Sequence, residues 1–384
     1  MMMGLKRIAA CLLAGSLALS CIYPYETELD SIEGTIVIEG DIILGDVSTF
    51  HVSRAQSLDG SFQYKEVPAQ AWVEDETGTV YRSVSQGGNT VDLTDAPADR
   101  RYRLHVADME SHRNYVSSWR EPQMAPVIDG ISFEVEPTDS PLRRPSGKAR
   151  VSMTAPEGAS RFFRWDYEQE WQFHANYDIR FDYDFLNEEY VFLDSNPNYW
   201  CWTKSRSSEA GIAIAIGDEQ NKIRDHVFMD FHTGIDNRFQ RRYAVHLIAR
   251  GISEECYQYL HTLEMNSNST GDLFAPNPSE LRGNLICEED PDELVLGFIE
   301  VSRTSDARAF LPRETMAYLD HGELDPSELY DLASSEIPQK YADGWRPSQN
   351  VTTEDGSYVG WAPPSWCDCR AMGGTNVKPS YWED

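Results

Sequence analysis

The sequence lacks the short motifs that mark the commonest catalytic sites. It contains no Gly-x-Ser-x-Gly turn, no His-Glu-x-x-His zinc motif, no phosphate-binding loop and no dinucleotide fingerprint. Basic residues are scarce too, since 33 Lys and Arg face 63 Asp and Glu and the formal net charge is −30. A surface of that charge repels the phosphate backbone of nucleic acids. We therefore expect a protein that is not an enzyme, needs no cofactor and binds no nucleic acid.

Long apolar runs are absent after the first 20 residues. Before that point, Lys6 and Arg7 precede an apolar run from Ile8 to Leu19, which is too short to span a bilayer and is typical of a secretory signal. The small residues before Cys21 resemble a bacterial lipobox, in which the cysteine becomes the first mature residue and carries acyl chains. Several acyl chains anchor a protein stably to a membrane. The predictions are a signal peptide over residues 1–20, a lipidated Cys21 and an acidic tether over residues 21–31.

Short strands separated by turn residues dominate the next part of the sequence. Segments such as "TIVIEG", "AQAWVEDETGTVY" and "RYRLHVAD" recur at short, regular intervals, a pattern typical of antiparallel β-sandwiches. We expect a mainly β protein with an N-terminal antiparallel β-sandwich, of the Ig-like or transthyretin-like kind, over residues 32–124. A larger β-rich domain with a few short helices and a disulfide-pinned tail is expected over residues 125–384.

The second domain contains the strongest periodicity in the chain. From Phe163 to Phe185 the odd positions are mostly aromatic or apolar, whereas the even positions are all polar. This alternation predicts a sheet with one aromatic face and one charged face. A single strand of that length would run roughly 75 Å, so we expect the chain to turn near Ala175. Helices are predicted to begin after Ser253, which would act as the N-cap, and at Asp325.

Two sets of residues are candidates for a functional site. On a regular strand, the polar residues of "DHVFMDFH" would share one face, where two imidazoles and a carboxylate could hold zinc; the alternative is a solvated strand face. In "NPNYWCWTKS" the aromatic residues are consecutive and cannot all face inward, which makes them candidate ligand contacts. The zinc candidates are His226, Asp230 and His232, and the candidate ligand contacts are Tyr199, Trp200 and Trp202.

An exported protein folds where cysteines can pair. A bond between Cys367 and Cys369 would close too small a ring for relaxed disulfide geometry. Each of these two is therefore expected to reach a different distant partner, with Cys201 and Cys287 as the candidates and the pairing left open. Cys256 falls on the apolar face of a predicted helix and is expected to stay unpaired.

Several motifs in the second half of the chain resemble a known family. They are the Gly283-Asn284-Leu285 segment, the strand from Val295 to Ile299, the Cys201-Trp202 pair, and a tail that carries Cys367-Asp368-Cys369-Arg370, Gly373-Gly374 and Lys378-Pro379 before Trp382. Their order and spacing are similar to those of the Bacteroidota outer-membrane lipoproteins that contain domain of unknown function 4249. The "VIEGDI" segment near the N-terminus also fits.

The resemblance implies a lipid-anchored protein of the outer membrane, at the cell surface rather than on its periplasmic face. Such lipoproteins are encoded beside TonB-dependent nutrient transporters. The expected function is therefore an accessory subunit that captures a ligand for such a transporter, and the resemblance does not identify the ligand. Two alternatives stay open, namely a stand-alone surface adhesin or scaffold and an exported hydrolase.

Overall fold

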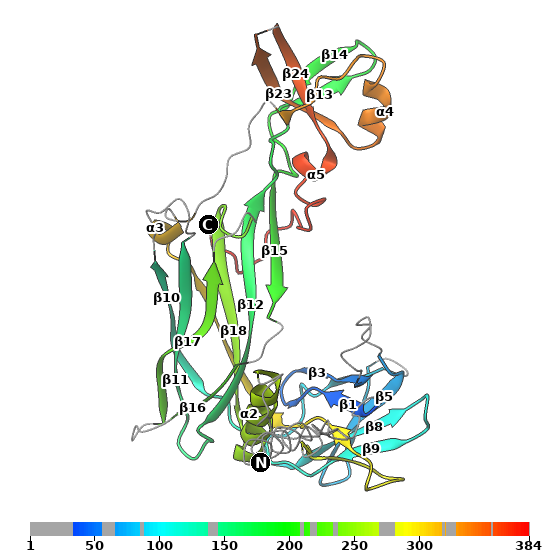
Figure 1. Ribbon diagram of the computed structural model, residues 1–384, viewed down its shortest axis with the longest axis vertical. Helices are drawn as coiled ribbons and strands as arrows, with labels where there is room; N and C mark the ends of the chain where they lie inside the picture. The colour runs from blue at the N-terminus through cyan, green and yellow to red at the C-terminus, as the bar shows by residue number, and fades with distance from the viewer. Residues whose placement is uncertain are drawn as a thin grey trace, which may run out of the picture.

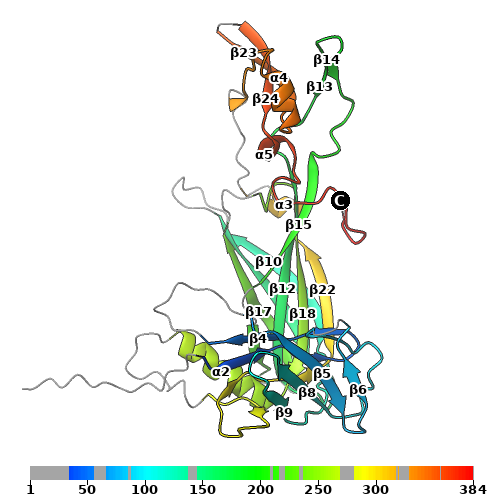
Figure 2. The ribbon, with the colours of Figure 1, turned by 90° about the vertical axis from the view of Figure 1, so that its right-hand side faces the viewer.

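The computed structural model describes residues 34–55, 66–84, 88–136, 145–207, 211–215, 221–232, 237–268, 281–316, 319, 328–354 and 356–383. The predicted signal peptide, Cys21, the tether and the start of the helix predicted at Asp325 lie outside these residues. Within them the chain is mostly β-strand with a few short helices, which confirms the predicted mainly β class. Figures 1 and 2 show three parts stacked along the long axis, which we call the base, the stalk and the head.

The base consists of residues 34–124 and 281–302. It contains sheets with the strand orders β20-β1-β4 and β19-β9-β8-β5-β6 and the pairs β3-β7 and β2-β21. The strands are β1 (Ile36–Glu39), β2 (Ile42–Ile43), β3 (Val47–Thr49), β4 (His51–Arg54), β5 (Ala69–Asp75), β6 (Val80–Arg82), β7 (Thr90–Asp92), β8 (Tyr102–Asp108), β9 (Asn114–Ser117), β19 (Leu285–Cys287), β20 (Val295–Leu296) and β21 (Val301–Ser302). Alternate residues of β5 are buried, as expected for a strand with one face in a core.

The base is completed by a segment far along the chain. β19 pairs with β9, and β20 pairs in parallel with β1. Leu285, Cys287, Val295, Ile299 and Val301 all belong to the same buried core as the first strands. The sequence placed these residues in the second domain, whereas the structure packs them in the core of the first.

The stalk consists of two sheets with the strand orders β10-β11-β17 and β15-β12-β18-β22, and β16 also pairs with β12. Its strands are β10 (Val127–Glu136), β11 (Ser146–Thr154), β12 (Phe162–His174), β15 (Trp200–Arg206), β16 (Gly211–Ile214), β17 (Lys222–His232), β18 (Arg242–Ile252) and β22 (Thr304–Phe310). The sheets share one core, which includes Met153, Phe163, Trp165 and Leu247. The even-numbered residues of β12 lie on the opposite face, so the predicted aromatic and charged faces are confirmed along this strand. β12 ends at His174, where the turn was expected.

A buried ion-pair cluster joins the base to the stalk. Asp41 of the base lies 3.1 Å from Arg164 of β12 and 3.1 Å from Arg250 of β18, measured between charged atoms. Arg250 also contacts Asp166 at 2.9 Å. Burial raises the pKa of Asp166, but Arg250 and Arg164 outweigh that effect and hold the pKa below its ordinary value. The cluster therefore stabilises the joint only while the carboxylates are ionised.

The head consists of the hairpins β13-β14 and β23-β24 with two short helices. Its elements are β13 (Phe181–Asp184), β14 (Glu189–Phe192), α4 (Ile337–Ala342), β23 (Arg346–Thr353), β24 (Gly356–Ala362) and α5 (Pro364–Cys367). A small core of its own contains Tyr177, Ile179, Leu329 and Val351. In both views the head lies at one end of the molecule and the base at the other.

Two further helices lie outside the head. α2 (Glu254–Asn268) follows the stalk strand β18, and α3 (Arg313–Met316) follows β22. The Ser253 hydroxyl accepts a hydrogen bond from the Cys256 N–H at 3.1 Å, which confirms the predicted N-cap. No helix in the described part of the chain is long and apolar enough to cross a bilayer.

A disulfide joins Cys201 of β15 to Cys369 in the C-terminal tail, with the Cα atoms 5.7 Å apart. One of the expected distant pairings is thus confirmed. The second is not formed, because Cys287 lies in the core of the base and Cys367 in the core of the head. Both are free thiols among the described residues, as is the buried Cys256.

Candidate functional site

The three residues predicted to hold zinc do not share a face. β17 and β11 pair with shifts in register, so that His226 lies opposite Val151 whereas Asp230 lies opposite Lys148. His226 therefore points to the core side, where its ring meets Trp165 at 5.1 Å, and burial lowers its pKa. An extra residue in a strand reverses the side-chain faces beyond it. Asp230 and His232 are exposed on the other face, so the three candidate zinc ligands are not brought together.

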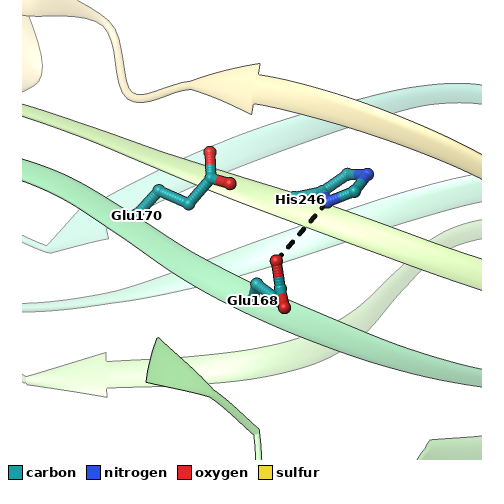
Figure 3. A group of neighbouring side chains, drawn as sticks. All are labelled: Glu168, Glu170 and His246. Carbon is teal, nitrogen blue, oxygen red and sulfur yellow. Dashed lines mark ion pairs between the residues drawn. The ribbon is translucent and has the colours of Figure 1, made fainter. Parts of the chain in front are cut away.

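A different group of potential ligands meets on the stalk. Glu168 and Glu170 of β12 and His246 of β18 place one ligand atom each within 4.8 Å of one another, on the polar face of the sheet (Figure 3). Glu168 and His246 are direct partners in the register of the two strands. The sequence reasoning missed this group, because the alternation places the two glutamates on a polar face and gives no sign of the distant histidine.

Two cations and one hydroxyl already bind the carboxylates of this group. Arg308 contacts both oxygens of Glu170, at 2.7 and 3.2 Å, and the Tyr381 hydroxyl donates to Glu170 at 3.0 Å. Lys204 lies 3.1 Å from Glu168. A metal ion would have to compete with these two cations for both carboxylates. We conclude that the group is an ion-pair network on the polar face of the stalk sheet, with Glu170 buried.

The same network fastens the C-terminal tail to the sheet. The guanidinium of Arg308 lies 3.6 Å from the centre of the Tyr381 ring, and Trp382 meets Phe310 of β22 edge-on at 5.1 Å. Burial and the adjacent Glu170 carboxylate raise the pKa of Tyr381, so its hydroxyl stays protonated and donates. The tail is thus held by polar contacts as well as by the disulfide.

The three aromatic residues predicted to contact a ligand have different environments. Tyr199 stacks on His174 and packs against the buried group around the disulfide. Trp202 exchanges backbone hydrogen bonds with Thr375 of the tail, at 2.8 and 2.9 Å. Trp200 lines a pocket of about 360 Å³, together with Gln172, Arg241, Arg242, Arg313 and Met316. Of the three candidates, only Trp200 lines a pocket described here.

A larger cleft of about 970 Å³ separates α2 from the base. Trp119, Tyr259 and Phe298 contribute rings to it. Arg120, one of its cations, is occupied by contacts to Glu255, to Ser253 at 2.6 Å and to Glu300 at 3.4 Å. The charge of Arg120 is therefore balanced by the chain's own carboxylates.

The head carries an apolar surface that the sequence reasoning did not single out. The hairpin formed by β13 and β14 exposes Leu186 to 89% and Phe192 to 63%, and Phe185 and Val191 are also exposed. The rings of Tyr183 and Phe185 meet at 5.0 Å, and Tyr183 also packs on the buried Trp361 of β24, so the hairpin is seated on the head while Leu186 and Phe192 stay exposed. The sequence signal that could have revealed this surface is the alternation of apolar and polar residues. It begins in β12 and continues into "FDYDFLNEEYVF", after the chain has left the stalk core.

Residues 22–308 match the family described as domain of unknown function (DUF4249). The chain belongs to this family. No curated protein matches it. The DUF4249 match includes the strands of the base, the hairpin β13-β14 and the strands of the stalk up to the middle of β22, and it ends before the remaining elements of the head and before Cys369.

Motif residues of the DUF4249 region prove to be structural. A Cβ atom on Gly283 would lie 1.6 Å from the carbonyl oxygen of Gly297. The Asn284 side chain donates to the Ile299 carbonyl and accepts from the Ile299 N–H, both at 2.8 Å. These contacts fold the segment from 283 to 299 onto itself, and both residues also line the cleft beside α2.

Proposed function

We propose that this protein is a Bacteroidota lipoprotein anchored through Cys21 to the outer membrane, at the cell surface. There it serves as an accessory subunit that captures a ligand for a TonB-dependent transporter. The lipobox-like sequence before Cys21 supports the anchor. Membership of the DUF4249 family fits the resemblance to transporter-associated lipoproteins.

The exposed hairpin β13-β14 is the observation that carries the proposal. Large apolar side chains gathered at one place on a surface mark protein interaction sites more often than side chains scattered singly. Leu186 and Phe192 are joined there by Phe185, Val191 and Tyr190, which are all exposed. Such side chains gain free energy when a partner covers them. We therefore assign the hairpin as the surface that docks on the transporter.

The position of the hairpin suits a protein held by its N-terminus. Gly34, the first described residue, follows Cys21 by 13 residues and belongs to the base, at the far end from the head. Thirteen extended residues span at most about 45 Å. The lipid anchor would keep the base near the bilayer and leave the head free to meet a partner.

The test is a pull-down of the full-length lipoprotein from outer membranes in mild detergent. The wild type is compared with Leu186→Asp/Phe192→Asp and with the control Ile286→Asp, in which a residue that is 51% exposed is changed on β19 of the base. We expect the wild type and the control to recover a TonB-dependent transporter and the hairpin variant to lose it. Recovery of the lipoprotein alone in all three would refute the proposal. Binding to cell-surface polymer without any transporter would instead indicate an adhesin.

A further inference from the structure

Three arginines gather around one pocket in a chain whose net charge is −30. Arg242 begins β18 and Arg241 directly precedes it, and Arg313 begins α3. We propose that this pocket binds a small organic carboxylate whose ring lies against Trp200. The inference deepens the proposed ligand-capturing function, on which it rests, by naming the chemical class of the ligand.

The charges at this pocket are poorly neutralised by the chain itself. Several other arginines of the stalk face carboxylates directly, as Arg308 does with Glu170 at 2.7 Å. Within the described part of the chain, no carboxylate lies within 4.0 Å of the guanidinium of Arg241 or Arg313. Arg242 has only Glu383, at 3.9 Å. An anion in the pocket would therefore meet three cations, and among the described residues only the Glu383 carboxylate would compete with it for one of them.

Arg242 is the most enclosed of the three arginines. Its side chain is 11% exposed, and its Nη1 donates to the Leu311 carbonyl at 2.9 Å. Its Nε is buried and has no hydrogen-bond partner among the described residues. Burial, followed by repulsion from Arg313, lowers the pKa of Arg242, although Glu383 opposes the shift. A carboxylate that entered the pocket would relieve both the unpaired donor and the repulsion.

The other lining groups indicate the shape of the ligand. The guanidinium of Arg241 lies 5.5 Å from the centre of the Trp200 ring, so cation and ring form one wall. Met316 adds an apolar contact, and the Gln172 amide can both donate and accept a hydrogen bond. A volume of about 360 Å³ lies at the small end of ligand pockets and suits a molecule of one or two rings. The fitting class is a ring that carries a carboxylate, such as a sugar acid or an aromatic acid.

The test is isothermal titration of the full chain, in detergent, with matched charged and neutral probes. Glucuronate is paired with glucose and benzoate with benzyl alcohol, and inorganic phosphate tests for an anion site without a ring preference. We expect saturable binding of at least one ring carboxylate, none of its neutral partner, and weaker binding at higher salt. The better of the two acids tells whether the ring is a sugar or an aromatic.

Variants locate the site. Arg241→Gln and Arg313→Gln change exposed side chains, so the fold is kept, and each is expected to weaken binding about tenfold or more. Arg303→Gln removes the same charge from an exposed residue that does not line the pocket and is expected to leave binding unchanged. No saturable binding of either acid, equal binding of phosphate, or binding that is insensitive to both pocket variants would overturn the inference. Binding of an acid by a protein that recovers no transporter would keep the site and refute the docking function alone.

Discussion

Removal of the disulfide between Cys201 and Cys369 should release the C-terminal tail from the stalk. The two residues are 168 apart in sequence, and both are fully buried. The chain-entropy relation gives about 5 kcal/mol for a loop of this length at 25 °C, an upper figure, since removal of native disulfides typically costs ~2–5 kcal/mol. We expect Cys201→Ala/Cys369→Ala to lower the free energy of unfolding within that range.

The assay combines guanidinium unfolding with hydrogen exchange at Trp202 and Thr375, whose amides bond to each other's carbonyls across the joint. Reductant should lower the unfolding midpoint of the wild type and the amide protection at these two residues, and it should leave the double variant unchanged. Cys367→Ala is the control, because it removes a buried free thiol and should retain the response to reductant. A wild-type midpoint and protection that do not respond to full reduction would refute the reasoning.

Three further predictions concern the joints and the ion-pair network. Gly283→Ala should destabilise the protein by about 3 kcal/mol in chemical unfolding, because its Cβ has no room, whereas Gly130→Ala, where nothing lies within 4 Å, should change stability by less than about 1 kcal/mol. The ion pairs of Asp166 should stabilise the wild type above about pH 4, its ordinary pKa, and this contribution should fade as the pH falls through the lower folded pKa. Asp166→Asn should therefore reduce stability at pH 7 and flatten the pH dependence, and an unchanged pH profile would count against it. Zinc titration should give no saturable binding that depends on His246, since Lys204 and Arg308 already occupy the neighbouring carboxylates; binding abolished by His246→Ala would contradict this.

Local patterns in the sequence were sufficient to predict structure that depends on residues close together in the chain. The alternation from Phe163 onward predicted the core face and the polar face of β12, and its length predicted the turn after His174. Ser253 followed by two glutamates predicted the start of α2. In each case the period of the backbone fixes which side chains share a face, so a single segment contains the information.

Contacts between distant segments could not be predicted in the same way. Nothing in the residues near Val295 shows that they pair with Ile36 and extend the sheet begun there. The zinc hypothesis failed for a related reason, because a register shift between β11 and β17 turns His226 to the core while the sequence alone implies a regular strand. The pairing of Cys201 with Cys369 likewise depends on where the tail meets β15.

The candidate sites illustrate the same limit. Trp200 was named from the sequence, but its three arginine neighbours come from β18 and α3, which only the fold brings to β15. The exposed hairpin was hidden in an alternation that looked like a core strand. The chain leaves the stalk core after His174, and the hairpin packs on Trp361 of β24 through Tyr183 and Tyr190, which leaves Leu186 and Phe192 exposed.

The claim that the head docks on a transporter is tested most directly by photocrosslinking in intact cells. A photoreactive phenylalanine derivative would replace Leu186 at the hairpin or, as a control, Ile286 on the base; the two side chains are 89% and 51% exposed. We predict a light-dependent adduct between position 186 and a TonB-dependent outer-membrane transporter, and no such adduct from position 286. No adduct from position 186, or the same adducts from both positions, would contradict the account.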